Sequence, residues 1–367
     1  MSETARAWGW HAHLRDGGTT PWDAWAGTAE AAGRVLPGAQ QLELLRRLNA
    51  ASGGVDAVLA ERVLTATAAG RGPVDLPLLG TPATWGPRPV DPAALPARQL
   101  LRVATTILAE DVAEHAPAPQ SRPAGPVRVR KGLRDHVLLG DPLAVADAAS
   151  RASGPAWFPA TTFAVSRRAV VFAGPFDRLL AHTWTYRCFD DGVARWGDWL
   201  DFWSGRDQPP PRLDLAAAAR SAGVCPRQVR VLTDSSAACA WAGAPLQVPG
   251  ADVADLARRI AGVLRILLPR DRAAAVMATW LMPRMPRTAT PPVAVGDRHR
   301  EWVERLAADA ALEIRRAGYS VVGDLGDLAP RPAEDVSRPR GVDAAALDLA
   351  VAMLVDDTWK SETRRHP

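Results

Sequence analysis

The chain has 367 residues, of which 47% are hydrophobic, enough for two domains or for one large domain with additions. Its formal charge is only +4, and its basic residues, nearly all arginine, are interspersed with acidic ones, which argues against nucleic acid as a partner. Three cysteines form too sparse and odd a set for a disulfide framework, and their spacing does not suit zinc.

The N-terminal residues, MSETARAWGWHAHLRDGG, lack a basic region followed by an apolar run, so we expect no signal peptide. The longest apolar stretch, near residues 260–268, is interrupted by arginine and is too short to cross a membrane. These features predict a soluble, cytoplasmic protein. His11 and His13 are two residues apart on a helical segment and would not share a face, so no metal site is expected.

Residues 1–115 are expected to form a helical N-terminal region. The sequence QLELLRRLNA (residues 41–50) has leucines at helical spacing with arginines on the other face. A second strong amphipathic run precedes His115. The Pro-rich sequence APAPQSRPAGPV (residues 116–127) then predicts a linker. The helices expected in this region cover residues 22–32, 41–50, 56–68 and 96–115.

After the linker, short apolar runs alternate with longer helical patterns, which is typical of an α/β domain with a mainly parallel sheet flanked by helices. We place this domain at residues 128–330, and a C-terminal loop and helix at 331–367. The clearest unit is the run AVVFA (residues 169–173), a short turn and the helix that follows it. The expected strands cover residues 136–139, 169–173, 228–233 and 319–323.

Two Trp-rich segments resemble each other at a constant offset of 174 residues, which indicates an old partial duplication of a helix–loop–helix unit; the alternative is two similar loops in a Trp-rich protein. The Trp pairs have two interpretations: anchors in the core, or a stacking surface for a sugar or aromatic ligand. In the second interpretation Arg187 and Asp190 would supply polar contacts. The matched pairs are Trp10 with Trp184, Asp16 with Asp190, Gly18 with Gly192, Trp22 with Trp196, and Trp25 with Trp199.

Three stretches together resemble the P-loop sulfotransferase-like proteins of high-GC bacteria. They are LELLRRLN (residues 42–49), residues 170–184 with 191–199, and Trp302 with RRAGYSVVGDLGDL (residues 315–328). The resemblance implies a three-layer α/β fold and 3′-phosphoadenosine-5′-phosphosulfate as the sulfate donor. It also implies transfer of a sulfuryl group to a hydroxyl, often on a carbohydrate.

The same resemblance implies a Gly-rich turn after the first strand of the domain, whose backbone N–H groups cradle the donor. Here that turn is Gly140-Asp141-Pro142, where Asp141 would repel a phosphate and Pro142 lacks an N–H donor. A second candidate turn, at residues 17–20, has suitable residue types. It makes Arg15 and Thr19 candidate ligand-binding residues, although it follows a helical segment rather than a strand.

A further implied feature is an arginine directly after the strand at 169–173, which in the family meets the 3′-phosphate. Gly174 stands at that position, and Arg178 follows one helical turn later. Both are candidate ligand-binding residues. Because both implied anion sites are missing or displaced, we expect donor binding to be weakened or lost while the fold is kept.

His182 lies on the helix after the same strand, near the edge of a parallel sheet where ligands bind, and it is the candidate general base. The simpler alternative is an ordinary polar residue of that helix. Three hypotheses for function remain: an active sulfotransferase-like enzyme, a non-catalytic relative that binds a glycan, nucleotide or protein through Trp196 and Trp199, and another nucleotide-dependent enzyme acting on glycosyl groups.

Overall fold

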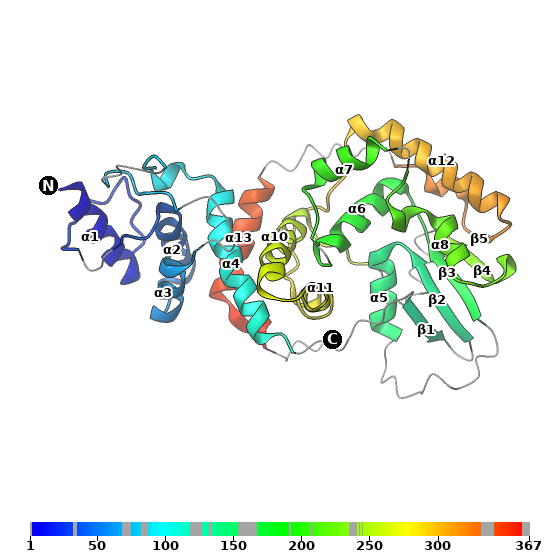
Figure 1. Ribbon diagram of the computed structural model, residues 1–367, viewed down its shortest axis with the longest axis horizontal. Helices are drawn as coiled ribbons and strands as arrows, with labels where there is room; N and C mark the ends of the chain where they lie inside the picture. Colours follow the sequence, from blue (N-terminus) through cyan, green and yellow to red (C-terminus); the bar gives the residue numbers. More distant parts are fainter. Residues whose placement is uncertain are drawn as a thin grey trace.

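A five-stranded sheet of order β1–β2–β3–β4–β5 lies at one end of the molecule (Figure 1). The first strand is antiparallel to the second, and the second to fifth strands run parallel to one another. This arrangement confirms the mainly parallel α/β sheet that the sequence predicts. The strands are β1 (Val127–Lys131), β2 (Arg134–Gly140), β3 (Arg167–Phe172), β4 (Val229–Leu232) and β5 (Ser320–Val322).

This computed structural model describes most of the chain. The linker predicted at 116–127 lies mainly outside it. The described residues are 2–31, 35–67, 75–81, 87–117, 127–131, 134–152, 167–190, 192–206, 208–234, 241, 243, 245–331 and 341–361.

Alternate side chains of the strands enter two separate apolar cores, as the two-residue period of a strand requires. Ala169 faces the larger core, together with residues of helices α6 (Phe176–Cys188) and α8 (Leu215–Ser221). Phe172 faces a smaller core, together with residues of α5 (Pro142–Ala152). The sheet is therefore buried on both faces, and its carboxyl edge is the part left for a ligand.

A group of helices at the other end of the molecule is built from both ends of the chain. Helix α4 (Ala97–His115) packs against α10 (Ala251–Leu267) and against α13 (Val342–Val355), as Figure 1 shows. Helix α10 thus lies within residues 128–330 in the sequence but packs with the N-terminal helices in space. The other α-helices are α1 (Glu3–Arg15), α2 (Ala39–Ser52), α3 (Ala57–Thr65), α7 (Trp196–Ser204), α11 (Arg270–Val276) and α12 (Arg300–Arg316).

The helix predicted at residues 22–32 is wrong. The chain makes a single turn at 22–24, and no helix follows in the described residues up to 31. The side chain of Arg6 holds this segment, because its Nη2 donates to the carbonyl oxygen of Trp22 at 2.6 Å and its Nε to that of Trp25 at 2.9 Å. The carbonyl oxygen of Trp22 also accepts from the N–H of Trp25 at 3.2 Å, which closes the single turn, whereas that of Trp25 bonds to the neighbouring helix.

The two Trp-rich segments share contacts around their first two tryptophans, although only the second continues into a helix, α7. Nε1 of Trp10 donates to the carbonyl oxygen of Thr20 at 2.9 Å, and Nε1 of Trp184 donates to that of Ala194 at 3.0 Å. Ring contacts match as well, at 5.4 Å between the centroids of Trp10 and Trp22 and 5.6 Å between those of Trp184 and Trp196. Every partner is shifted by the same 174 residues, which supports the duplication inferred from the sequence.

Candidate functional site

A cavity of about 530 Å³ lies at the carboxyl edge of the parallel strands. Its walls come from the residues that follow β2, β3 and β4, from the turn after β5, and from α6. Ligands of open α/β sheets bind at this edge, because the loops that leave it can diverge around a ligand. Gly174, Arg178 and His182, three of the residues that the sequence singled out, all line the cavity.

The turn after β2 is tight and closed by its own carboxylate. Gly140 has a φ of +87°, and a Cβ there would clash with the backbone of Phe172 in the neighbouring strand. Oδ1 of Asp141 accepts from the backbone N–H groups of Leu143 at 3.0 Å and Ala144 at 3.3 Å. The carboxylate therefore fills the N-terminus of α5, the place where a bound phosphate would have to lie.

The other oxygen of Asp141 holds the imidazole of His182. The distance between Oδ2 and Nδ1 is 2.5 Å, and the two residues are only 6% and 5% exposed. An ionised carboxylate can only accept, so this bond places a proton on Nδ1. In the described part of the chain Nε2 has no hydrogen-bond partner, and the ring lines the cavity. The pair is thus arranged so that Nε2 can accept a proton from a ligand.

Arg178 lies one helical turn before His182 on α6, so both side chains lie on the cavity side of that helix. Its side chain is half-buried and makes no hydrogen bond or ion pair with a described residue. Helix α6 begins after Gly174-Pro175, and no side chain of the described residues caps its first N–H groups. This end of the cavity therefore has an unpaired cation beside the positive end of a helix dipole.

The opposite wall follows β4 and β5. Oγ1 of Thr233 lies 3.3 Å from Oδ2 of Asp327, which also accepts from the backbone N–H of Asp324 at 3.0 Å. The chain then reaches Arg331, whose N–H lies 3.4 Å from Oδ1 of Asp177 on α6. The loop after β5 is thereby bonded across the cavity to the helix that carries Arg178 and His182.

The tryptophans of the second Trp-rich segment lie outside the cavity, in an aromatic cluster of their own. Trp196 stacks on Trp199 with ring centroids 5.6 Å apart, and Trp199 also meets Trp203. Trp199 is only 4% exposed, whereas Trp196 is half-buried and donates from Nε1 to the carbonyl oxygen of Ala294 at 2.8 Å. In this arrangement the rings pack chiefly against one another.

The remaining sequence candidates lie in other places. Asp190 is 3.5 Å from the guanidinium of Arg212, and Arg187 is half-buried on the last turn of α6, away from the cavity lining. Arg15 is the last residue of α1 and Thr19 follows it, and α1 lies at the end of the molecule remote from the sheet (Figure 1). Both are exposed. The structure brings three of the nine candidates together and leaves the other six elsewhere.

His11 and His13 make separate contacts. The ring of His13 stacks on Trp25 and lies 3.0 Å from Oγ1 of Thr20. His11 is 9% exposed, and its buried Nδ1 has no hydrogen-bond partner in the described part of the chain. Burial, and then the charge of Arg15, lower the pKa of His11 below its ordinary value.

A pH dependence of stability follows from His11. Above about pH 6.5 the imidazole is neutral in both the folded and unfolded states. Below that pH the unfolded chain binds the proton first, so the stability is lost as the pH falls towards the lowered folded pKa. We expect urea unfolding at pH 5.5 and pH 8 to differ less in His11→Gln than in the unsubstituted protein, whereas His115→Gln, an exposed control, should change nothing. Equal pH dependence of the free energy of unfolding in all three proteins would contradict this role of His11.

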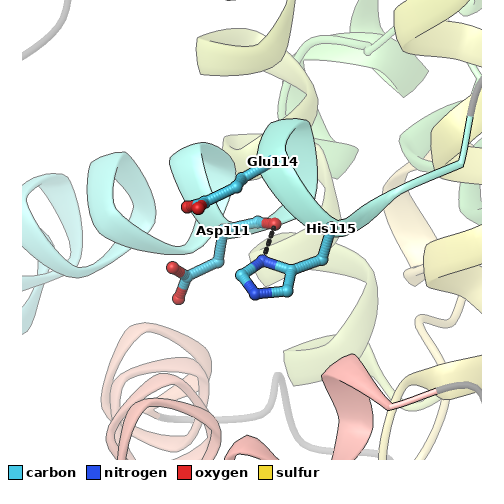
Figure 2. A group of neighbouring side chains, drawn as sticks. All are labelled: Asp111, Glu114 and His115. Carbon is cyan, nitrogen blue, oxygen red and sulfur yellow. Dashed lines mark hydrogen bonds between the residues drawn. The ribbon is translucent and has the colours of Figure 1, made fainter.

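Figure 2 shows a group on the last turns of α4, Asp111, Glu114 and His115, whose ligand atoms all lie within 4.8 Å of one another. Such spacing could suit a cation. However, the carboxylate of Asp111 already lies 2.8 Å from Arg62 and 3.1 Å from Lys360, in ion pairs without hydrogen-bond geometry. His115 uses Nδ1 to bond the carbonyl oxygen of Asp111 at 2.9 Å. Two cations already neutralise the buried acid, so a metal would have to displace them.

Sequence reasoning missed two residues of the cavity. The sequence predicts for Asp141 only that it repels phosphate, although a carboxylate directly after a strand is a signal for a site at that edge. Arg331 precedes a Pro-rich stretch without any periodic pattern, and no sequence signal points to it.

None of the described helices is long and apolar enough to cross a membrane. No family model, curated protein or solved structure matches the chain.

Proposed function

We propose that the cavity at the carboxyl edge of the sheet is the active site of a transferase, and that His182 is its general base. The observation that carries this proposal is the buried pair of His182 and Asp141, with Nδ1 engaged and Nε2 open to a ligand. In the reaction, Nε2 takes the proton of an acceptor hydroxyl as that oxygen bonds to the transferred group, whose bond to the donor breaks, with the electron pair leaving on the desulfated donor. The carboxylate of Asp141 orients the ring and stabilises the imidazolium that forms.

The reaction that the family resemblance implies is transfer of a sulfuryl group from a nucleotide donor to a carbohydrate hydroxyl. The turn at Gly140-Asp141-Pro142 does not fit such a donor, since Asp141 already fills the helix N-terminus that would hold the phosphosulfate. We therefore derive no step through the donor. If it binds, it must do so elsewhere in the cavity.

Equilibrium binding of the desulfated product, 3′-phosphoadenosine-5′-phosphate, tests the sulfuryl-transfer reaction. Saturable binding measured by titration calorimetry would support it. Absence of binding at millimolar ligand would contradict it and would favour the second candidate function. In that candidate the fold is kept, donor binding is lost, and the cavity or the Trp196 cluster binds a glycan, a nucleotide or a protein. The filled N-terminus of α5 favours this candidate.

His182→Gln is expected to lower turnover by about 10²- to 10⁴-fold, because proton transfer then depends on water. The assay supplies 3′-phosphoadenosine-5′-phosphosulfate and sugar acceptors, and it measures release of the desulfated product. His115→Gln is the matched control, since His115 is an exposed histidine on α4. If His182→Gln retained full turnover, the general-base role would be wrong.

A further inference from the structure

The charged side chains that line the cavity differ in whether they already have a partner. Each lining carboxylate is engaged: Asp141 by His182, Asp327 by Thr233, and Asp147 and Asp234 by other groups. The side chains of the two lining arginines, Arg178 and Arg331, have no hydrogen bond or ion pair among the described residues. The cavity therefore presents two arginine side chains without a described partner, the half-buried Arg178 and the exposed Arg331, whereas its four carboxylates already have partners.

We infer that the cavity binds a compact oxyanionic group (a carboxylate, phosphate or sulfate) through Arg178 and Arg331. This rests on the proposed location of the site and not on the proposed reaction. A guanidinium presents several N–H donors in a planar fork that fits the oxygens of such groups, so an arginine left unpaired in a cavity selects an anion.

Both arginines are positioned by contacts that do not use their guanidinium groups. Arg178 belongs to α6, one turn from His182, so an anion bound there lies on the same side of the helix as Nε2. Arg331 is fixed through its backbone: its N–H lies 3.4 Å from Asp177, and its carbonyl oxygen accepts from Arg300 at 3.2 Å. The side chains remain available to the ligand.

A buried polar group gives an independent sign that the cavity has an occupant. His182 is 95% buried, since its exposed fraction is 5%, yet its Nε2 has no partner in the described part of the chain. This nitrogen opens onto the cavity as an acceptor, so a hydroxyl or a water can supply its hydrogen bond, and that donor would lie beside a bound anion. The first turn of α6, uncapped by any side chain, adds a favourable dipole for an anion at the same end.

Titration calorimetry with sodium sulfate, phosphate and acetate, at constant ionic strength, tests the inference. We expect at least one of these anions to bind saturably, and Arg178→Gln and Arg331→Gln each to weaken that binding about tenfold or more. Sulfate or phosphate binding in preference to acetate would assign a tetrahedral group, and the reverse would assign a carboxylate. Arg227→Gln is the matched control, an exposed arginine just before β4 at the opposite edge of the sheet.

Absence of saturable binding by all three anions would overturn the inference, as would equal binding by the Arg178, Arg331 and Arg227 variants. His182→Gln should keep anion binding, which separates this result from the proposed function. If anion binding depended on Arg178 while His182→Gln retained turnover, the general-base role of His182 would be contradicted, but the anion site would still be supported. If His182→Gln lost turnover but no anion bound, the inferred anion site alone would be contradicted.

Discussion

Replacing Gly140 with alanine is expected to lower the free energy of unfolding by about 4 kcal/mol or more, or to prevent folding. A Cβ at this position would clash with the carbonyl oxygen of Phe172 and would lie 2.9 Å from its carbonyl carbon. Those atoms belong to the backbone of the adjacent parallel strand and cannot rotate away. The φ of +87° adds about 1–2 kcal/mol for any residue with a side chain.

Gly223→Ala separates the cost of the steric clash from the cost of the positive φ. Gly223 also has a positive φ, +64°, but a Cβ there would meet no atom within 4 Å. Gly223→Ala should therefore lower the free energy of unfolding by only about 1–2 kcal/mol, the cost of the positive φ alone. Chemical denaturation followed by circular dichroism measures both variants. If Gly140→Ala were no less stable than Gly223→Ala, the close approach of β2 and β3 at the cavity would be wrong.

Asp141→Ala is expected to lower the free energy of unfolding by about 2–4 kcal/mol, because it removes two contributions at once. One is the cap of α5, which is worth about 1 kcal/mol. The other is the buried hydrogen bond to His182, which is worth about 1.5–3 kcal/mol when one partner is charged. The measurement is again denaturant unfolding, at a pH where the carboxylate is ionised.

Asp214→Ala is the matched control for the cap. Asp214 caps α8 by accepting from the backbone N–H of Ala217 at 2.7 Å, without a histidine partner, so its loss should cost about 1 kcal/mol. A double-mutant cycle of Asp141→Ala with His182→Gln should give a coupling energy of about 1.5–3 kcal/mol, the contribution of the buried hydrogen bond. Equal losses in Asp141→Ala and Asp214→Ala, with no coupling to His182, would contradict the buried pair.

The sequence predicts β2 to β5 because each is a short apolar run bounded by Gly, Pro or polar residues. It does not reveal β1, since three of the five residues Val127–Lys131 are charged and the strand looks like the end of a polar linker. The false helix at 22–32 fails for a different reason. Its carbonyl oxygens bond to Arg6 of α1, a tertiary contact that local propensity cannot anticipate.

Within the site, Gly174, Arg178 and His182 could be predicted together because all three follow one strand, and Arg178 and His182 share the helix that begins after Gly174. The partnership of His182 with Asp141 could not, since 41 residues separate them and only the pairing of β2 with β3 brings them close. The position of Arg331 could not be predicted either, because it reaches the cavity through a loop that is held by a contact with the distant Asp177.

The protonation of His182 can be measured without knowing the substrate. Long-range proton–nitrogen correlation spectra of ¹⁵N-histidine-labelled protein, at about pH 9 where imidazoles are ordinarily neutral, report which ring nitrogen carries the proton. His182→Gln assigns the signal by its loss. We expect the proton on Nδ1, bound to Asp141, and an unprotonated Nε2 that faces the cavity. A proton on Nε2 would contradict the general-base role, because that nitrogen could not then accept a proton from a ligand.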